Sequence, residues 1–214
     1  MMAVDHVTLG AISLDAGAAF LHDALGIDMP PGGKHPDMST HNRVLNVGDS
    51  RFLELIAIDP EAPKPPHRRW FGLDDPGVAD RLAAAPRGLG WVVRTDALDQ
   101  LIDRSPVDLG EARRMSRGER TWRLTVREAG DMPFDGLVPA FIEWSPGPHP
   151  SEAMRFLGPR LDGIALRHPQ ADKLRDVLQT LGVLEFVSVL ETAATASLTF
   201  QFRMPDGSVR SLGA

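Results

Sequence analysis

The stretch Asp5-His6-Val7-Thr8-Leu9-Gly10 opens the chain on a strand pattern, and Phe52-Leu53-Glu54-Leu55-Ile56-Ala57 repeats that pattern further on. Each stretch carries one metal-ligand type of side chain, His6 or Glu54, among hydrophobic residues. Burying such a group is costly unless it is paired, hydrogen-bonded or bound to an ion. The two residues therefore predict a metal site or an acid–base site on neighbouring strands.

The chain around these stretches repeats one order of elements: strand, helix, strand, strand. The first unit predicts strands over residues 4–12, 43–47 and 51–58 and a helix over 15–25. The second predicts strands over 89–95, 111–117, 121–128 and 138–144 and a helix over 97–104. A third, shorter copy predicts strands over 162–167, 185–190, 197–203 and 208–212 and a helix over 170–181. The expected fold class is α+β.

Proline-rich connectors divide the units. Residues 59–70 hold four prolines and lead to a predicted helix over 76–85, and residues 146–150 form a second break. We expect residues 1–150 to hold two paired modules, at about 1–72 and 88–146. Residues 151–214 would form the third module, packed on the same body, because a small sheet with one helix leaves a face uncovered.

Composition excludes several classes of function. The 214 residues carry a net charge of −6, which argues against a nucleic-acid partner. Cysteine is absent from the sequence, so disulfides, thiolate metal sites and cysteine nucleophiles are excluded. The hydrophobic stretches are too short for a membrane span, and the early strand pattern leaves no room for a signal peptide. We expect a soluble, cytoplasmic protein with no membrane partner.

Strand alternation assigns the polar residues to faces. His6 and Glu54 both point to one concave face if their strands share a sheet. In the second unit, Glu143 shares a face with Phe141 and repeats the placement of Glu54. One His and two Glu on three strands suit a divalent metal with open coordination positions. In the alternative interpretation, His6 is a hydrogen-bonded core residue and Glu54 lies on the solvated face of an edge strand.

The modules and their polar residues resemble the vicinal oxygen chelate superfamily, which includes glyoxalase I, extradiol dioxygenases and fosfomycin-resistance proteins. More narrowly, the chain looks like the glyoxalase-like domain family. The motifs that carry this resemblance are Asp5-His6, Gly32-Gly33-Lys34-His35-Pro36, Thr40-His41-Asn42 and Phe52-Leu53-Glu54-Leu55-Ile56-Ala57. They cover about residues 3–72. The resemblance implies repeated βαβββ modules that form a cupped mixed sheet around a divalent metal, with the helices outside.

The same resemblance implies metal ligands on the first and last strands of each module. It assigns His6, Glu54 and Glu143 to the metal and places Trp91 where the fourth ligand usually lies. An indole N–H only donates, so Trp91 cannot ligate. Three alternatives follow: a three-ligand site, a further ligand from a loop histidine, or no metal. The metal would be Zn, Ni, Mn or Fe.

The loop over residues 32–42 is predicted to contact the substrate, because its paired glycines let backbone approach a ligand closely. Its basic side chains would attract an acidic substrate. The candidate substrate-binding residues are Gly33, Lys34, His35, His41, Asn42 and Trp91. His35 and His41 are also the loop histidines that would complete the metal's ligands. The structural alternative is that this loop merely covers the sheet.

The expected function is a glyoxalase-like, metal-dependent enzyme that carries out lyase- or isomerase-type proton transfer on a small vicinal-oxygen substrate. Glu143 or Glu54 would be the catalytic base, and His6 a fixed ligand. The alternatives are an extradiol-type dioxygenase and a metal-free protein that binds or sequesters small molecules. The superfamily resemblance also implies a homodimer.

Overall fold

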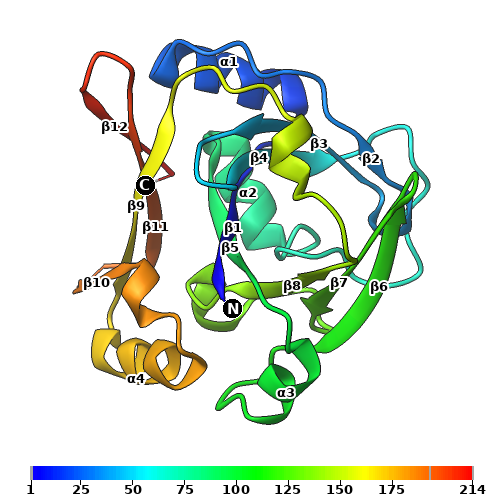
Figure 1. Cartoon of the computed structure of the whole chain (residues 1–214), viewed down its shortest axis with the longest axis vertical. Helices are drawn as coiled ribbons and strands as arrows, with labels where there is room; N and C mark the ends of the chain where they lie inside the picture. The colour runs from blue at the N-terminus through cyan, green and yellow to red at the C-terminus, as the bar shows by residue number, and fades with distance from the viewer. Residues whose placement is uncertain (1, 193, 214) are drawn as a thin grey trace.

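The computed structural model describes residues 2–192 and 194–213, and within them a βαβββ order occurs three times (Figure 1). The first module contains β1 (Ala3–Gly10), α1 (Leu14–Leu25), β2 (Lys34–His35), β3 (Thr40–Asn46) and β4 (Phe52–Ile58). The second contains β5 (Arg87–Arg94), α3 (Leu98–Asp103), β6 (Glu111–Arg117), β7 (Arg120–Val126) and β8 (Ala140–Trp144). The third contains β9 (Arg160–His168), α4 (Ala171–Leu181), β10 (Ser188–Glu191), β11 (Ser197–Arg203) and β12 (Val209–Leu212).

The first two modules share one mixed sheet with the strand order β2-β3-β4-β1-β5-β8-β7-β6. Strands β1 and β5 pair antiparallel at its centre, and each module adds its last strand parallel to its first. The sheet curls until its two edges approach each other (Figure 1). The expected α+β fold with a cupped mixed sheet is confirmed. The two-residue strand β2 was not predicted, because so short a strand leaves no alternation to detect.

The convex face of the sheet carries the larger core. Helix α1 packs Leu21 and Leu25 against it; the Ser13 side chain caps the start of this helix, and Gly26 ends it with a positive φ of 69°. The third module has its own sheet, ordered β10-β9-β11-β12, and β11 packs on β5. Phe200 and Phe202 of β11 are buried in the same core as α1. The boundary at residue 150 stays a prediction.

The concave face is partly filled by the connector between the first two modules. Residues 59–85 run back into the curl, where α2 (Pro76–Ala84) lies inside the sheet (Figure 1). Trp70, Phe71 and Leu82 from this segment pack on concave-face residues such as Val92 and Ile142. The connector therefore leaves open only part of the cup.

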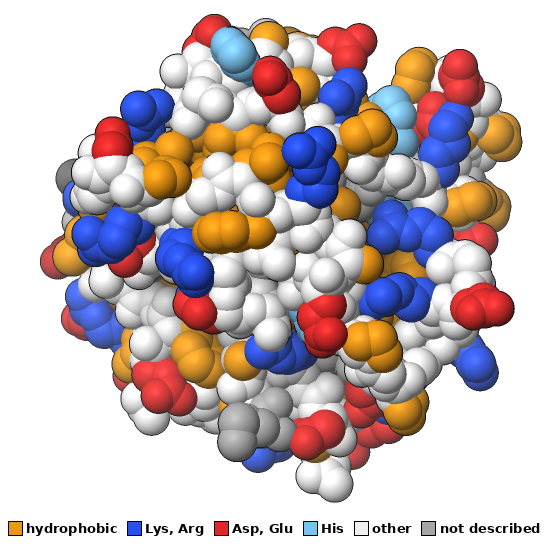
Figure 2. Space-filling view, turned by 45° about the horizontal axis from the view of Figure 1, so that its top comes forward, with side chains coloured by type: hydrophobic (Ala, Val, Ile, Leu, Met, Phe, Trp, Pro, Cys, Tyr) orange, Lys and Arg blue, Asp and Glu red, His pale blue; other side chains and the backbone are white. Residues whose placement is uncertain are grey.

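The surface is mixed in charge on the face seen in Figure 2. Lys and Arg side chains alternate there with Asp and Glu, and hydrophobic side chains fill short stretches between them. Among the described residues, no helix has the length and apolar character to cross a membrane.

Candidate active site

A β-bulge in β1 puts two neighbouring polar residues on the same side of the sheet. Val4 pairs with Val93 of β5 and His6 pairs with Val92, so Asp5 is an extra residue in the ladder. Neighbouring side chains on a regular strand point to opposite faces, and a bulge re-aims one of them. As a result, His6 Nδ1 lies 2.6 Å from Asp5 Oδ1.

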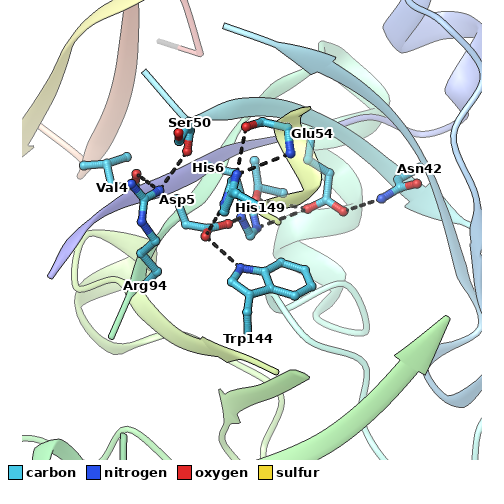
Figure 3. A network of polar contacts seen from close by, with 11 residues as sticks. Val4, Asp5, His6, Asn42, Ser50, Glu54, Arg94, Trp144 and His149 are labelled. Carbon is cyan, nitrogen blue, oxygen red and sulfur yellow. Dashed lines mark hydrogen bonds and ion pairs between the residues drawn. The ribbon is translucent and has the colours of Figure 1, made fainter. Parts of the chain in front are cut away.

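The Asp5 carboxylate is fully buried and accepts three hydrogen bonds (Figure 3). Besides His6, it accepts from Trp144 Nε1 at 2.9 Å and from His149 Nε2 at 3.0 Å. Burial on its own would raise the pKa of Asp5, but the hydrogen bonds from His149 and His6 outweigh it and hold the pKa well below the ordinary carboxyl value. Asp5 is therefore a fixed negative charge at the base of the site.

Because an ionised carboxylate only accepts, Asp5 determines which ring nitrogens carry protons. His6 donates through Nδ1, so the Nε2 of the neutral ring carries a lone pair. His149 donates through Nε2, and its Nδ1 accepts from the backbone N–H of Ser151 at 3.3 Å. His149 is thus held on both sides, whereas His6 keeps one nitrogen for chemistry.

The free nitrogen of His6 faces Glu54. The distance from His6 Nε2 to Glu54 Oε2 is 3.9 Å, too long for a hydrogen bond. Glu54 is held by Asn42 Nδ2, at 2.7 Å from Oε1, and by Thr8 Oγ1, at 3.2 Å from Oε2. The His6 ring stacks on Phe52, with centroids 4.4 Å apart. Both functional groups are therefore fixed in place by neighbouring side chains (Figure 3).

These groups line a small cavity of about 50 Å³ between the concave face of the sheet and the connector. Its polar lining consists of His6, His35, Asn42, Glu54 and Arg117. Its apolar lining includes aromatic residues from both modules and from the connector: Phe52, Trp70, Phe71, Trp122 and Trp144. The cavity therefore combines an acid–base pair with an aromatic wall.

His35 sits at the cavity edge as a neutral ring. Its Nδ1 lies 3.1 Å from Thr40 Oγ1, and its Nε2 lies 3.4 Å from Asn42 Nδ2. Burial lowers the pKa of His35 from 6.5 to about 4, and the neighbouring Arg117 adds to that lowering. The ring therefore accepts from the Asn42 amide and helps to orient it towards Glu54.

This half-buried neutral ring predicts acid sensitivity. The unfolded chain binds a proton at His35 below about pH 6.5 and the folded protein only below about pH 4, so stability falls as pH drops through that window. Wild-type protein should lose free energy of unfolding between about pH 6.5 and pH 4, and His35→Gln is expected to remove about 3 kcal/mol of that loss, as measured by urea unfolding. His22→Gln, at an exposed histidine beside Asp28, is the control and should leave the slope unchanged. Equal slopes for wild type and His35→Gln would contradict the prediction.

Glu143 and Trp91 lie on the opposite face of the sheet from His6. The Glu143 carboxylate accepts from Arg123 Nε at 2.8 Å, and Arg123 also binds Asp99 of α3 at 2.8 Å. Trp91 is fully buried in the convex core, and its Nε1 donates to the Leu137 carbonyl at 2.9 Å. The structure does not bring Glu143 or Trp91 to the cavity, because a shift of one residue along a strand reverses the face.

The loop residues are divided between the two faces. Asn42 and His35 line the cavity, and the backbone N–H of Gly33 donates to Asn42 Oδ1 at 2.9 Å. Lys34 points away and binds Asp59 at 2.9 Å. His41 does not line the cavity, because it precedes Asn42 on β3 and takes the opposite face.

Sequence reasoning gave no role to four residues that build the site. Asp5 was part of the quoted motif, but regular alternation separates it from His6, and only the bulge joins them. His149 and Trp144 come from the end of the second module. Arg117 comes from the end of β6. A signal for His149 exists in the run Pro148-His149-Pro150, which reads as a rigid surface loop, but its target more than a hundred residues away is not visible in the sequence.

The model of the glyoxalase-like domain matches residues 4–182. The chain belongs to the glyoxalase-like domain family. A solved structure described as a hypothetical protein from Staphylococcus aureus is similar, with 13% identity and a TM-score of 0.59, over 92% of this chain and 81% of that one. A methylmalonyl-CoA epimerase from Mycobacterium tuberculosis matches with 18% identity and a TM-score of 0.44, over 70% of this chain and 91% of the epimerase.

At 13% identity the likeness to the Staphylococcus aureus structure concerns the fold alone. A search of curated proteins finds no match. Membership of the glyoxalase-like domain family rests on the match of the family model. The resemblance that the sequence motifs carry implies a divalent metal at this site.

The donor set of this chain fits such a metal poorly. His6 pairs with Phe52 in the parallel β1–β4 ladder, and Glu54 follows Phe52 by two positions. In the second module, Val92 of β5 is the residue that pairs with His6. Val92 also pairs with Ala140 in the parallel β5–β8 ladder, and Ile142 follows Ala140 by two positions. The two equivalent positions are therefore apolar. Within residues 2–192 and 194–213, no group of three or more His, Cys, Asp or Glu side chains is placed to hold one metal ion.

Proposed function

We propose that this family member is an enzyme that transfers a proton within a small, oxygen-rich substrate, using His6 as the general base and no bound metal. The observation that carries the proposal is the Asp5–His6 pair: a buried carboxylate holds Nδ1 at 2.6 Å and leaves Nε2 facing the cavity. A histidine oriented by a buried carboxylate is a recurrent arrangement for a catalytic base.

The chemistry follows from these positions. His6 Nε2 takes a proton from a substrate carbon next to a carbonyl, and the C–H electron pair becomes an enolate. The protonated ring then lies between two carboxylates, Asp5 at Nδ1 and Glu54 across 3.9 Å at Nε2, which stabilise its positive charge. Return of the proton to the same carbon gives exchange or inversion of that carbon. In a hydroxyketone, the enediolate instead takes the proton at the former carbonyl carbon while its hydroxyl proton passes to the other oxygen, which gives the isomer. Either return restores His6.

The other functions expected from the sequence are supported by fewer of these contacts. A metal-dependent lyase or isomerase and an extradiol-type dioxygenase both need further ligands, and Val92 and Ile142 stand at the positions that would supply them. A binding protein without turnover agrees with the aromatic lining but gives no account of the Asp5–His6 pair. The homodimer and the cytoplasmic location stay predictions.

Deuterium exchange tests the proposal directly. The protein is incubated in D₂O with a panel of small 2-oxo acids and hydroxyketones, and protein-dependent loss of the proton next to the carbonyl is followed by ¹H NMR. His6→Gln is expected to slow exchange by about 10²- to 10⁴-fold, because it removes the base. The matched control is Glu143→Gln, which neutralises a carboxylate on the opposite face and should keep the wild-type rate.

Metal content separates the competing functions. Exchange that persists in EDTA, in protein that holds no stoichiometric metal by elemental mass spectrometry, is the expected result. Stoichiometric Zn, Ni, Mn or Fe that is lost in His6→Gln would contradict the metal-free mechanism. Ligand binding without exchange on any panel member would favour the binding protein instead.

A further inference from the structure

We infer that the ligand of this cavity is an organic acid with an apolar or aromatic body, and that Arg117 binds its carboxylate. The inference deepens the proposed function, because it names a substrate class for the same site. It rests on a cation that lines the cavity without a carboxylate partner, on its nearness to the acid–base pair, and on the apolar wall opposite.

Arg117 crosses from the second module to the first. It ends β6, an edge strand of the sheet, and its guanidinium Nη1 lies 3.5 Å from Asn42 Oδ1 on β3. A Cβ at Gly33 would lie 2.8 Å from the same nitrogen, so a side chain there would make the flexible guanidinium shift. The glycine therefore gives Arg117 the space to reach the cavity.

The charge of Arg117 is not neutralised within the described residues. Its side chain donates one weak hydrogen bond, to the Asn42 amide oxygen, and no carboxylate of the described residues forms an ion pair with it. Arg123 on the neighbouring strand β7, and Arg127 directly after that strand, each bind two carboxylates. A part-buried guanidinium that lines a cavity and lacks such a partner suits a ligand carboxylate, which it can bind with two parallel hydrogen bonds.

The position of Arg117 sets the orientation of the acid. The Asn42 amide joins the two ends of the site: its Oδ1 faces Arg117, and its Nδ2 donates to Glu54 at 2.7 Å. Glu54 and Asp5 repel a ligand carboxylate from the His6 end. With its carboxylate at Arg117, a small acid presents the next carbon atoms to His6 Nε2, where the proposed proton transfer takes place.

The remaining lining favours an apolar body. Trp122, Trp144 and Ile142 form one wall of the cavity, and Phe71 belongs to the connector that covers it. Trp70 also lines this cavity, and its indole N–H is buried with no acceptor among the described residues. A buried donor without a partner calls for an explanation, and an oxygen of a bound acid would accept from it.

Paired acids and amides test the inference. The probes are phenylacetate with phenylacetamide and mandelate with mandelamide, and dissociation constants are measured by ligand-observed NMR. Wild-type protein is expected to bind each acid about 10-fold or more tightly than its amide, because a charge-assisted hydrogen bond is lost with the amide. Arg117→Gln should weaken the acids by a similar factor and leave the amides unchanged.

Arg114→Gln is the matched control, because it removes the same charge from β6 at an exposed residue outside this cavity. It should keep the preference for acids. Equal affinity of acids and amides for wild type, equal effects of the two substitutions, or no binding by any of the four probes would overturn the inference. So would a loss of both acids and amides in an Arg117→Gln protein that remains folded by circular dichroism, because Arg117 would then only shape the cup.

The two proposals fail separately. A preference for acids that depends on Arg117, without deuterium exchange on any substrate, overturns the proton-transfer function and leaves the acid site. Exchange that depends on His6, with acids and amides bound equally, overturns the acid site and leaves the function.

Discussion

Asp5→Asn is expected to lower the free energy of unfolding by about 3 kcal/mol, although it removes only one charge and almost no volume. The Asp5 carboxylate accepts from His6, Trp144 and His149 at 2.6–3.0 Å and is fully buried. Trp144 and His149 donate to Oδ2, and His6 donates to Oδ1. The asparagine amide replaces one of these acceptors by a donor, so either one N–H group faces another donor or His6 moves its proton to Nε2, and the charge-assisted hydrogen bonds are lost in both cases. Urea unfolding at pH 7 measures the change.

The control for this variant is Asp28→Asn, at an exposed carboxylate that also contacts a histidine, His22. It should change stability by less than about 1 kcal/mol. The pH profile adds a second readout. Because the pKa of Asp5 is depressed in the folded protein, its contribution is complete above about pH 4 and is lost as pH falls below that. The Asp5→Asn protein should not show this loss of stability at acid pH. An unchanged free energy of unfolding at pH 7 would contradict the stabilising role of the hydrogen-bond network.

Trp91→Ala is expected to lower the free energy of unfolding by about 4 kcal/mol, in the range of buried aromatic truncations. Trp91 pairs with Val7 across the central β1–β5 ladder and is fully buried in the convex core. The substitution opens a cavity there and leaves the Leu137 carbonyl without the indole donor, which now lies at 2.9 Å. Urea unfolding again supplies the measurement.

The same variant separates a core role from the substrate-binding role expected from the sequence. Folded Trp91→Ala protein should keep the wild-type preference for acids over amides, because Trp91 faces away from the cavity. Trp122→Ala provides the contrast: it removes an aromatic ring from the cavity wall and should weaken all four probes. Loss of probe binding in folded Trp91→Ala, at the level of Trp122→Ala, would contradict the assignment of faces.

The sequence predicted features that arise from local interactions better than features that depend on contacts between distant residues. Hydrophobic periodicity located α1 and β6 to within a residue or two, because those patterns arise within one element. It also indicated that His6 and Glu54 share a face. The sequence did not determine on which face of the sheet Glu143 lies, because the run 140–144 fits strand alternation with either set of side chains on the concave face. Arg123 and Asp99, which bind on the convex side, decide it.

The sequence by itself determined the βαβββ repeat, the family and the first half of the site, because these depend on local pattern and on motifs within one module. Only the tertiary structure decided the rest. The bulge that turns Asp5 toward His6 depends on pairing between β1 and β5. The placement of His149 and Arg117 around that pair depends on how the sheet curls. Such contacts join residues from distant parts of the chain, so their geometry arises from packing between strands and leaves no periodic trace in the sequence.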